Sequence, residues 1–134
     1  MQAHPLRLSP GDDLRVALQH ALSELGLQAA FVIQGMGSLS VAQLRFAGKE
    51  DATELRDDLE ILTLAGSLSP DGVHLHMSVA DSRGQVLGGH VAHGCVVRTT
   101  AEILLGLLPA YRFSREHDDA TGFPELVISP VRHA

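Results

Sequence analysis

The 134-residue sequence has no tryptophan, only 4% aromatic residues and a single cysteine, Cys95. One cysteine cannot form an internal disulfide, which is typical of a reducing compartment. Because aromatic rings are so few, the core must be built from the Leu, Val, Ile and Ala residues that dominate the 45% hydrophobic fraction. A chain of this length is expected to fold as a single domain, 1–134, and to bury about two-thirds of its unfolded surface.

The sequence also lacks a long apolar run and a cluster of basic residues. The longest apolar candidate, 103–110, is shorter than the roughly 20 residues that cross a bilayer. The N-terminus has no charged start followed by an apolar run, so no secretory signal is expected. The net charge of −6 does not suit a phosphate backbone, which is bound mainly by Lys and Arg. We therefore expect a cytoplasmic protein with no membrane contact, and the charge argues against direct DNA binding.

Most of the patterns that are present have the two-residue period of a β-strand. One principal helix is expected at about residues 10–26, with Ser9 as N-cap, Pro10 in the first helical position and Gly26 as the stop. The glycines of segment 35–38 predict a turn or bulge. Strands are expected at 4–9, 29–34, 39–46, 59–68, 111–115 and 126–129, whereas 96–108 fits strand or helix. The sum is an α+β fold, mainly antiparallel sheet with one principal helix.

The segment 72–90 predicts a β-hairpin with a defined register. Asp81 and Gly84 suit the first and last positions of a type I turn, and a glycine in the left-handed region completes a three-residue loop. This register pairs His76 with His90. One face of the hairpin is then apolar and is expected to face the core; its residues are Leu75, Met77, Val79, Leu87 and Val91.

The other face of the predicted hairpin carries His74, His76 and His90. Residues two apart on a strand are separated by roughly 6.6 Å, and opposed Cβ atoms by about 4.5–5.5 Å. Three imidazoles placed in this way can share one ion, so we predict a site for zinc or another divalent transition metal. The alternative is a set of hydrogen-bonded histidines at a sheet surface. A one-residue slip in the turn would move His90 to the other face.

Several motifs stand in the order typical of the PPC (plants and prokaryotes conserved) domain. They are GMGSL at 35–39, Leu44-Arg45, LEILTLAG at 59–66, DGVHLH at 71–76, GGH at 88–90, GCVV at 94–97 and TTAE at 99–102. The sequence resembles this family from about residue 4 to 129. Some prokaryotic members look like metal proteins, and the matching residues here are His74, His76 and His90.

The resemblance implies an α+β fold and a homotrimer, for which segment 103–108 is a candidate contact. In plants the domain binds protein partners beside AT-hook segments that grip DNA, and this sequence contains no Arg-Gly-Arg-Pro AT-hook. Prokaryotic members are usually the domain alone and are often labelled DNA-binding. The resemblance therefore favours a trimeric, metal-binding regulatory or interaction module that binds a protein partner.

The alternative function is a zinc-dependent, hydrolase-like enzyme acting on a small molecule. Three histidines and a water are the ligands with which zinc generates hydroxide near neutral pH. Glu60, Glu102 and His93 are candidates for a general acid or base, and Arg45 for holding an anionic substrate. Each has a structural alternative: Glu102 and Arg45 as an ion pair at a subunit contact, and Glu60 as a solvated strand residue. Cys95 is expected to be a small buried side chain rather than a ligand.

Overall fold

The structure, a computed structural model, describes residues 1–132. They form β1 (Gln2–Leu8), α1 (Leu14–Glu24), β2 (Ala30–Arg45), β3 (Thr53–Ser69), β4 (Gly72–Ala80), β5 (Val86–Val91), β6 (Val96–Leu107), β7 (Tyr111–Asp118) and β8 (Phe123–Pro130). The predicted α+β fold, mainly antiparallel sheet with one helix, is confirmed. Among the described residues no helix is long and apolar enough to cross a membrane.

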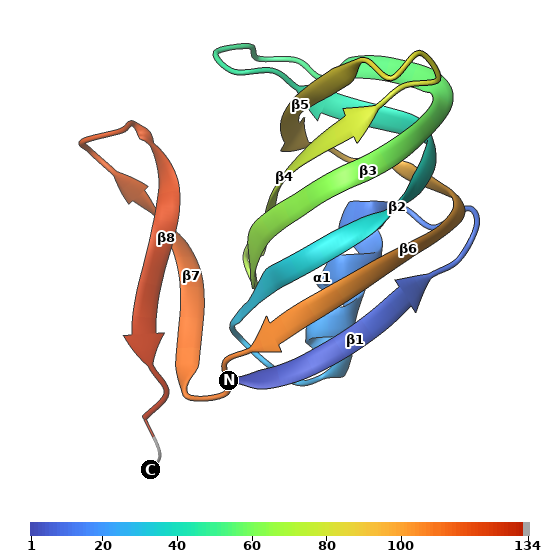
Figure 1. Cartoon of the computed structure of the whole chain (residues 1–134). Helices are drawn as coiled ribbons and strands as arrows, with labels where there is room; N and C mark the ends of the chain where they lie inside the picture. Colours follow the sequence, from blue (N-terminus) through green and yellow to red (C-terminus); the bar gives the residue numbers. More distant parts are fainter. Residues whose placement is uncertain (133–134) are drawn as a thin grey trace.

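Six strands form one antiparallel sheet in the order β1-β6-β2-β3-β4-β5. The last strand also pairs with β2, through Leu44 opposite Val91 and Arg45 opposite His90, so the sheet curls back on itself. Strands β7 and β8 pair with each other and stand beside the sheet as a separate hairpin (Figure 1). The curl brings a histidine of β5 next to an arginine of β2.

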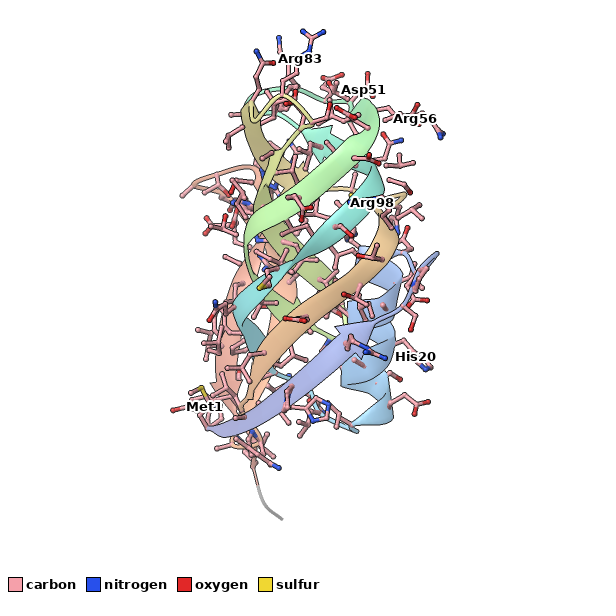
Figure 2. The ribbon with its side chains drawn as sticks, turned by 45° about the vertical axis from the view of Figure 1, so that its right-hand side comes forward. Met1, His20, Asp51, Arg56, Arg83 and Arg98 are labelled. Atoms are coloured by element: carbon pink, nitrogen blue, oxygen red, sulfur yellow. The ribbon has the colours of Figure 1, made fainter. Side chains whose placement is uncertain are left out.

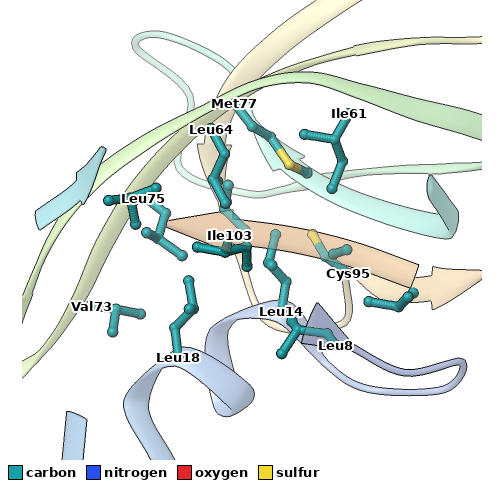
Figure 3. Close-up of a cluster of buried hydrophobic side chains, with 14 of the residues drawn as sticks. Leu8, Leu14, Leu18, Ile61, Leu64, Val73, Leu75, Met77, Cys95 and Ile103 are labelled. Atoms are coloured by element: carbon teal, nitrogen blue, oxygen red, sulfur yellow. The ribbon is translucent and has the colours of Figure 1, made fainter. Parts of the chain in front are cut away.

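The core lies between α1 and the inner face of the curled sheet. Leu14 and Leu18 point from α1 toward Leu75 and Met77 of β4 (Figure 3), and all four side chains are buried. Full burial of such a side chain contributes roughly 1.5–3 kcal/mol to folding. Because the odd-numbered residues of β4 are committed to this core, its even-numbered residues face outward.

The helix α1 begins later than predicted. Its N-cap is Asp13, whose carboxylate accepts hydrogen bonds from the N–H groups of Val16 (3.1 Å) and Gly94 (2.7 Å). Ser9 and Pro10, predicted as N-cap and first helical residue, belong instead to a turn that precedes the helix. Asp13 is the effective cap because one of its oxygens satisfies the helix N-terminus while the other binds the loop before β6.

The C-terminal end of α1 agrees with the prediction. Gly26 has φ 66° and donates to the carbonyl of Ser23 at 3.0 Å, while Leu27 donates to the carbonyl of Leu22 at 3.3 Å. This pair of bonds satisfies the last free carbonyls of the helix and needs a left-handed residue, which favours glycine. Gly26 is therefore the stop.

Gly35 and Gly37 lie inside a continuous strand. The pairing of β2 with β6 changes register between Gly37 and Leu39, so the bulge is confirmed and the turn is not. A Cβ on Gly37 would overlap the backbone of Thr100 and Ala101. The missing side chain therefore permits the close approach of β2 and β6.

The segment 96–108, which fitted either strand or helix, forms strand β6 up to Leu107. Ile103, Leu105 and Leu107 are buried in the core of the same chain, so these three side chains are not available for the predicted subunit contact. Leu104, which points to the opposite side, remains partly exposed. The alternation arises because the segment is extended and one of its faces covers α1.

Gly66 positions the strand that carries the histidines. A Cβ at this residue would overlap the carbonyl oxygen of His74 and lie 3.0 Å from the Cα of Leu75. We predict that Gly66→Ala lowers the free energy of unfolding by about 1–3 kcal/mol, because the backbone of β4 must move. The measurement is urea unfolding followed by circular dichroism.

Gly106→Ala is the control for this substitution. Its Cβ would meet the side-chain ends of Met1 and Ile33, at 2.6 and 2.9 Å, and flexible side chains can rotate away. A smaller loss of stability is therefore expected. Equal losses for the two variants would contradict the close approach at Gly66.

Candidate metal centre

The β4–β5 hairpin that carries the histidines has the predicted register. His76 lies opposite His90, and Ser78 lies opposite Gly88. Gly84, with φ 79°, donates to the carbonyl of Asp81 at 2.9 Å. The Asp81 carboxylate also accepts from backbone N–H groups within and just after the loop, at 2.9 Å each. These bonds hold the loop at three residues and therefore fix which side chains share a face.

The predicted core face of the hairpin is correct except at one residue. Leu75, Met77, Val79 and Val91 are buried, but Leu87 is 39% exposed. β5 pairs with β2 only at its last two residues, so Leu87, nearer the turn, has no such neighbour on that side. The prediction was wrong there because periodicity gives the face of a residue and not what covers that face.

The three histidines converge on the outward face. The Nε2 atoms of His74 and His76 are 3.1 Å apart. The ring centroids are 4.9 Å apart for His74 and His76, 4.3 Å for His76 and His90, and 5.5 Å for His74 and His90. One nitrogen from each ring lies within 4.8 Å of the other two.

This geometry fits the donor set of a transition metal. Two nitrogens bound to one tetrahedral ion at about 2.1 Å are about 3.4 Å apart, close to the spacing between His74 and His76. His90 is held beside these two rings because its Cα is paired with that of His76, and one of its nitrogens lies within 4.8 Å of theirs. The trio can therefore hold one ion and leave a fourth position open.

Burial keeps two of the imidazoles neutral, which is the form that binds metal. Desolvation lowers the pKa of His74, with further lowering by Arg115 and by the other two histidines. Desolvation likewise lowers the pKa of His90, followed by the charges of Arg45 and His76. Both rings therefore stay neutral to a lower pH than a free imidazole.

Arg115 is a site residue that sequence reasoning missed. Its Nη2 donates to the Ser67 hydroxyl at 2.8 Å and lies 3.2 Å from Nδ1 of His74. Its backbone N–H donates to the Asp71 carboxylate at 2.9 Å, which attaches β7 to the turn before β4. The signal was absent because Arg115 is 41 residues from His74 in the sequence. Only the return of the β7–β8 hairpin brings them together.

The contact between Arg115 and His74 defines one protonation pattern. An arginine can only donate, so Nδ1 of His74 accepts and the ring proton is on Nε2, directed at Nε2 of His76. These two hydrogen bonds, from Arg115 to His74 and from His74 to His76, are the metal-free alternative for the histidines. A metal ion on Nε2 of His74 would move the proton to Nδ1, where it would face the Arg115 donor.

The predicted catalytic residues are dispersed. Arg45 lies opposite His90 and donates from Nη1 to the Lys49 carbonyl at 3.1 Å. Glu60 lies opposite Ala80, at the end of β4 next to the β4–β5 turn, and its Oε1 is 3.8 Å from Nη2 of Arg98. Glu102 is exposed on β6, three strands from β4 in the sheet order. The structure thus brings Arg45 to the trio but neither glutamate.

His93, a candidate acid or base, and Cys95, which was not expected to be a ligand, also lie apart from the trio. His93 is exposed in the turn that follows β5. Cys95 is fully buried, and burial raises the pKa of its thiol to about 11, so the thiol stays protonated at neutral pH. Its sulfur accepts a hydrogen bond from the backbone N–H of Gln43 at 3.2 Å. Cys95 is a packed core residue, as expected.

The fold and the trio together define a small β-rich domain with a candidate three-histidine metal centre. Residues 1–109 match the Plants and Prokaryotes Conserved (PCC) domain. The chain belongs to this family, which confirms the resemblance seen in its motifs.

Curated relatives place the domain in a longer chain. Two proteins of Synechococcus strains, both named bifunctional protein GlmU, are 53% identical over 131 residues and 50% identical over 134 residues. The match covers 98% and 100% of this chain but 21% and 22% of those proteins. The chain therefore spans about a fifth of the length of these relatives.

Solved structures share the whole fold. A hypothetical protein from Salmonella is 41% identical with a TM-score of 0.93, covering 96% of this chain and 94% of that one. A metal-containing protein from Archaeoglobus fulgidus is 27% identical with a TM-score of 0.79, covering 95% and 94%. Two others carry a provisional DNA-binding label at 21% and 23% identity, which shows the fold alone.

The shifted pKa values give a test of the site geometry. In metal-free protein, we expect His74 and His90 to titrate with midpoints below the ordinary value near 6.5, because burial disfavours the charged imidazole. The measurement is an NMR titration of the ring protons. Arg115→Gln should raise the midpoint of His74, because it removes the positive charge beside the ring. Midpoints at or above the ordinary value would mean that the rings are not packed together.

Proposed function

We propose that this chain is a metal-binding domain of the Plants and Prokaryotes Conserved family that acts as a regulatory or interaction module. His74, His76 and His90 hold the ion. The observation that carries the proposal is the convergence of one nitrogen from each ring within 4.8 Å. The related structure from Archaeoglobus fulgidus, described as metal-containing, supports it.

Zinc is the expected ion, and other divalent transition metals of similar preference are the alternatives. Neutral imidazoles suit zinc, copper, iron and nickel, whereas calcium and magnesium take oxygen ligands. Three protein ligands with one open position are typical of sites that bind an exchangeable fourth ligand. When bound, the ion supplies a concentrated positive charge at the mouth of the site.

A module function is supported by the relatives and by the charge of the chain. In the Synechococcus proteins the domain is about a fifth of a longer polypeptide, which suits an accessory role. The net charge of −6 does not favour contact with nucleic acid phosphates. The proposed partner is therefore a protein or a small molecule rather than DNA.

A zinc-dependent hydrolase remains the second candidate, favoured by the cleft that opens beside the trio and includes Arg45. Glu60 and Glu102 do not reach the trio, so the general acid or base proposed from the sequence would have to be another group. If the module function holds, metal-loaded wild type and His76→Ala behave alike on ester, phosphoester and lactone substrates. Turnover that His76→Ala abolishes would favour the enzyme.

A homotrimer is proposed together with the metal site. Apolar side chains on the outer face of β2 support it, since Ile33 and Met36 are 51% and 52% exposed. Leu104 of β6 is partly exposed and is paired with Gln34 of β2, and it lines the same groove as Met36. An apolar sheet face of this kind suits contact with a second copy of the chain.

The trimer predicts that Ile33→Glu yields a monomer, because a charge on the apolar face cannot be buried without a partner. Light scattering after size-exclusion chromatography gives the mass. Val16→Glu is the matched control, since Val16 is 54% exposed on α1 rather than on the sheet, and it should stay trimeric. A monomeric wild type would contradict the proposal.

Metal content is the direct test of the proposed function. We expect elemental analysis to find one metal ion per chain, and zinc titration of the metal-free protein to give the same stoichiometry. His76→Ala should weaken binding by at least 100-fold, because a three-ligand site loses one ligand. His20→Ala, which removes an exposed histidine from α1 (Figure 2), is the control. Equal metal content in both variants would exclude the trio as the site.

A further inference from the structure

We propose that the cleft beside the trio binds a small organic oxyanion, a phosphate or a carboxylate, between Arg45 and Arg115. The proposal rests in part on the metal site, because both arginines are neighbours of the histidines. It goes further by naming the ligand class and the residues that recognise it.

The cleft has the size of a small-molecule site. Its volume is about 940 Å³, near the upper end of the 300–1,000 Å³ typical of such pockets. His74 and His90 form part of its lining, so a ligand in the cleft can reach the proposed ion. A ligand of moderate size therefore fits next to the trio.

Four basic side chains line this cleft, although the chain as a whole carries a net negative charge. They are Arg15, Arg45, Lys49 and Arg115, with Glu50, Asp71 and Glu125 as the acidic residues of the lining. Within residues 1–132 the ion pairs involve other residues and none of these four cations. The basic side chains of the lining outnumber its carboxylates by one, and Asp13 acts on Arg15 from nearby, so Arg45 and Arg115 are the charges best placed for a ligand.

Arg115 is the donor most directly committed to the site. When His74 binds metal through Nε2, its ring proton lies on Nδ1. The Nδ1–H group then faces the Arg115 guanidinium, 3.2 Å away, and both groups are donors. A metal-bound histidine normally donates its second N–H to a carboxylate or carbonyl. No hydrogen bond from His74 to a carboxylate is present among the described residues, although Glu125 acts on its charge from nearby, and an oxyanion in the cleft can accept from both donors.

Arg45 provides the second guanidinium on the opposite side of the trio. It is the direct neighbour of His90 through the β2–β5 pairing. Nη1 donates to the Lys49 carbonyl at 3.1 Å, and within the described residues Nε and Nη2 form no hydrogen bond. A guanidinium with two donors left is suited to bidentate binding of a phosphate or carboxylate.

Arg15 adds a third positive charge deeper in the wall. Its Nη1 donates to the Val91 carbonyl at 3.0 Å, while Nε is buried and has no partner in the described chain. An unpaired buried donor is costly, and the nearby carboxylate of Asp13 offsets only part of the cost of burying this charge, so a further anion in the cleft would add to that effect. This charge supports an anion in the cleft even without direct contact.

The β8 side of the cleft suits an organic body rather than a bare ion. Phe123 and Pro124 line it, and Phe123 is 66% exposed, so an apolar group of a ligand can pack on its ring. Phenyl phosphate and benzoate are therefore suitable probes, with inorganic phosphate to separate recognition of the charge from recognition of the body.

The experiment is calorimetric titration of the full chain with phenyl phosphate, benzoate and inorganic phosphate, after zinc loading and measurement of metal content. We expect phenyl phosphate or benzoate to bind more tightly than inorganic phosphate. Arg45→Gln should weaken binding by about tenfold or more, the worth of one charge-assisted pair, without changing metal content. Arg115→Lys, which keeps the charge but not the fork, should also weaken it.

Arg83→Gln is the matched control, because Arg83 is an exposed arginine at the tip of the β4–β5 turn (Figure 2). Wild type and Arg83→Gln should bind equally. The proposal is overturned if Arg45→Gln binds as tightly as Arg83→Gln, or if zinc-loaded wild type binds none of the probes at millimolar concentration. A wild type without metal would contradict the metal site instead, and the same titrations of the arginine variants would still decide the anion site.

Discussion

The three-residue turn between β4 and β5 is the constraint on which the rest of the site depends. Side chains on a strand alternate between faces, so the number of residues in the turn decides whether His90 faces His76 or the core. The Asp81 carboxylate, by accepting two backbone N–H groups, favours one loop length over the next. The same register buries Met77 and Val79, and core packing and histidine convergence therefore reinforce each other.

Local patterns predicted this hairpin correctly because turn chemistry and alternation act over a few residues. They also gave the stop of α1 at Gly26 and the bulge near Gly37. The start of the helix was wrong, since two adjacent segments both had capping residues and a long-range bond from Gly94 to Asp13 decided between them. The exposure of Leu87 was missed for a similar reason: the two-residue period of a strand assigns a side chain to one face of the sheet but does not show whether another element covers that face.

The surroundings of the trio could not be predicted, because they are built by contacts between distant segments. Arg45 reaches His90 only because the sheet curls until β5 meets β2. Arg115 reaches His74 only because β7 folds back along the end of β3 and β4. The sequence singled out Arg45 as a candidate for holding an anionic substrate but did not place it beside His90, and Arg115 was not distinguished at all. The three histidines come from one hairpin and could be predicted together, whereas the two arginines beside them come from distant segments of the sequence.

The β7–β8 hairpin has little of its surface on the main sheet (Figure 1). Its attachment to the start of β4 consists largely of polar bonds from one residue, Arg115, to Ser67, Asp71 and His74. It also contributes Phe123 and Pro124 to the cleft wall. A molecule bound in the cleft would contact both the β7–β8 hairpin and the main sheet. Such a molecule would add to the contacts that hold the hairpin on the sheet, beside the buried ring of Phe113 that packs on Phe31.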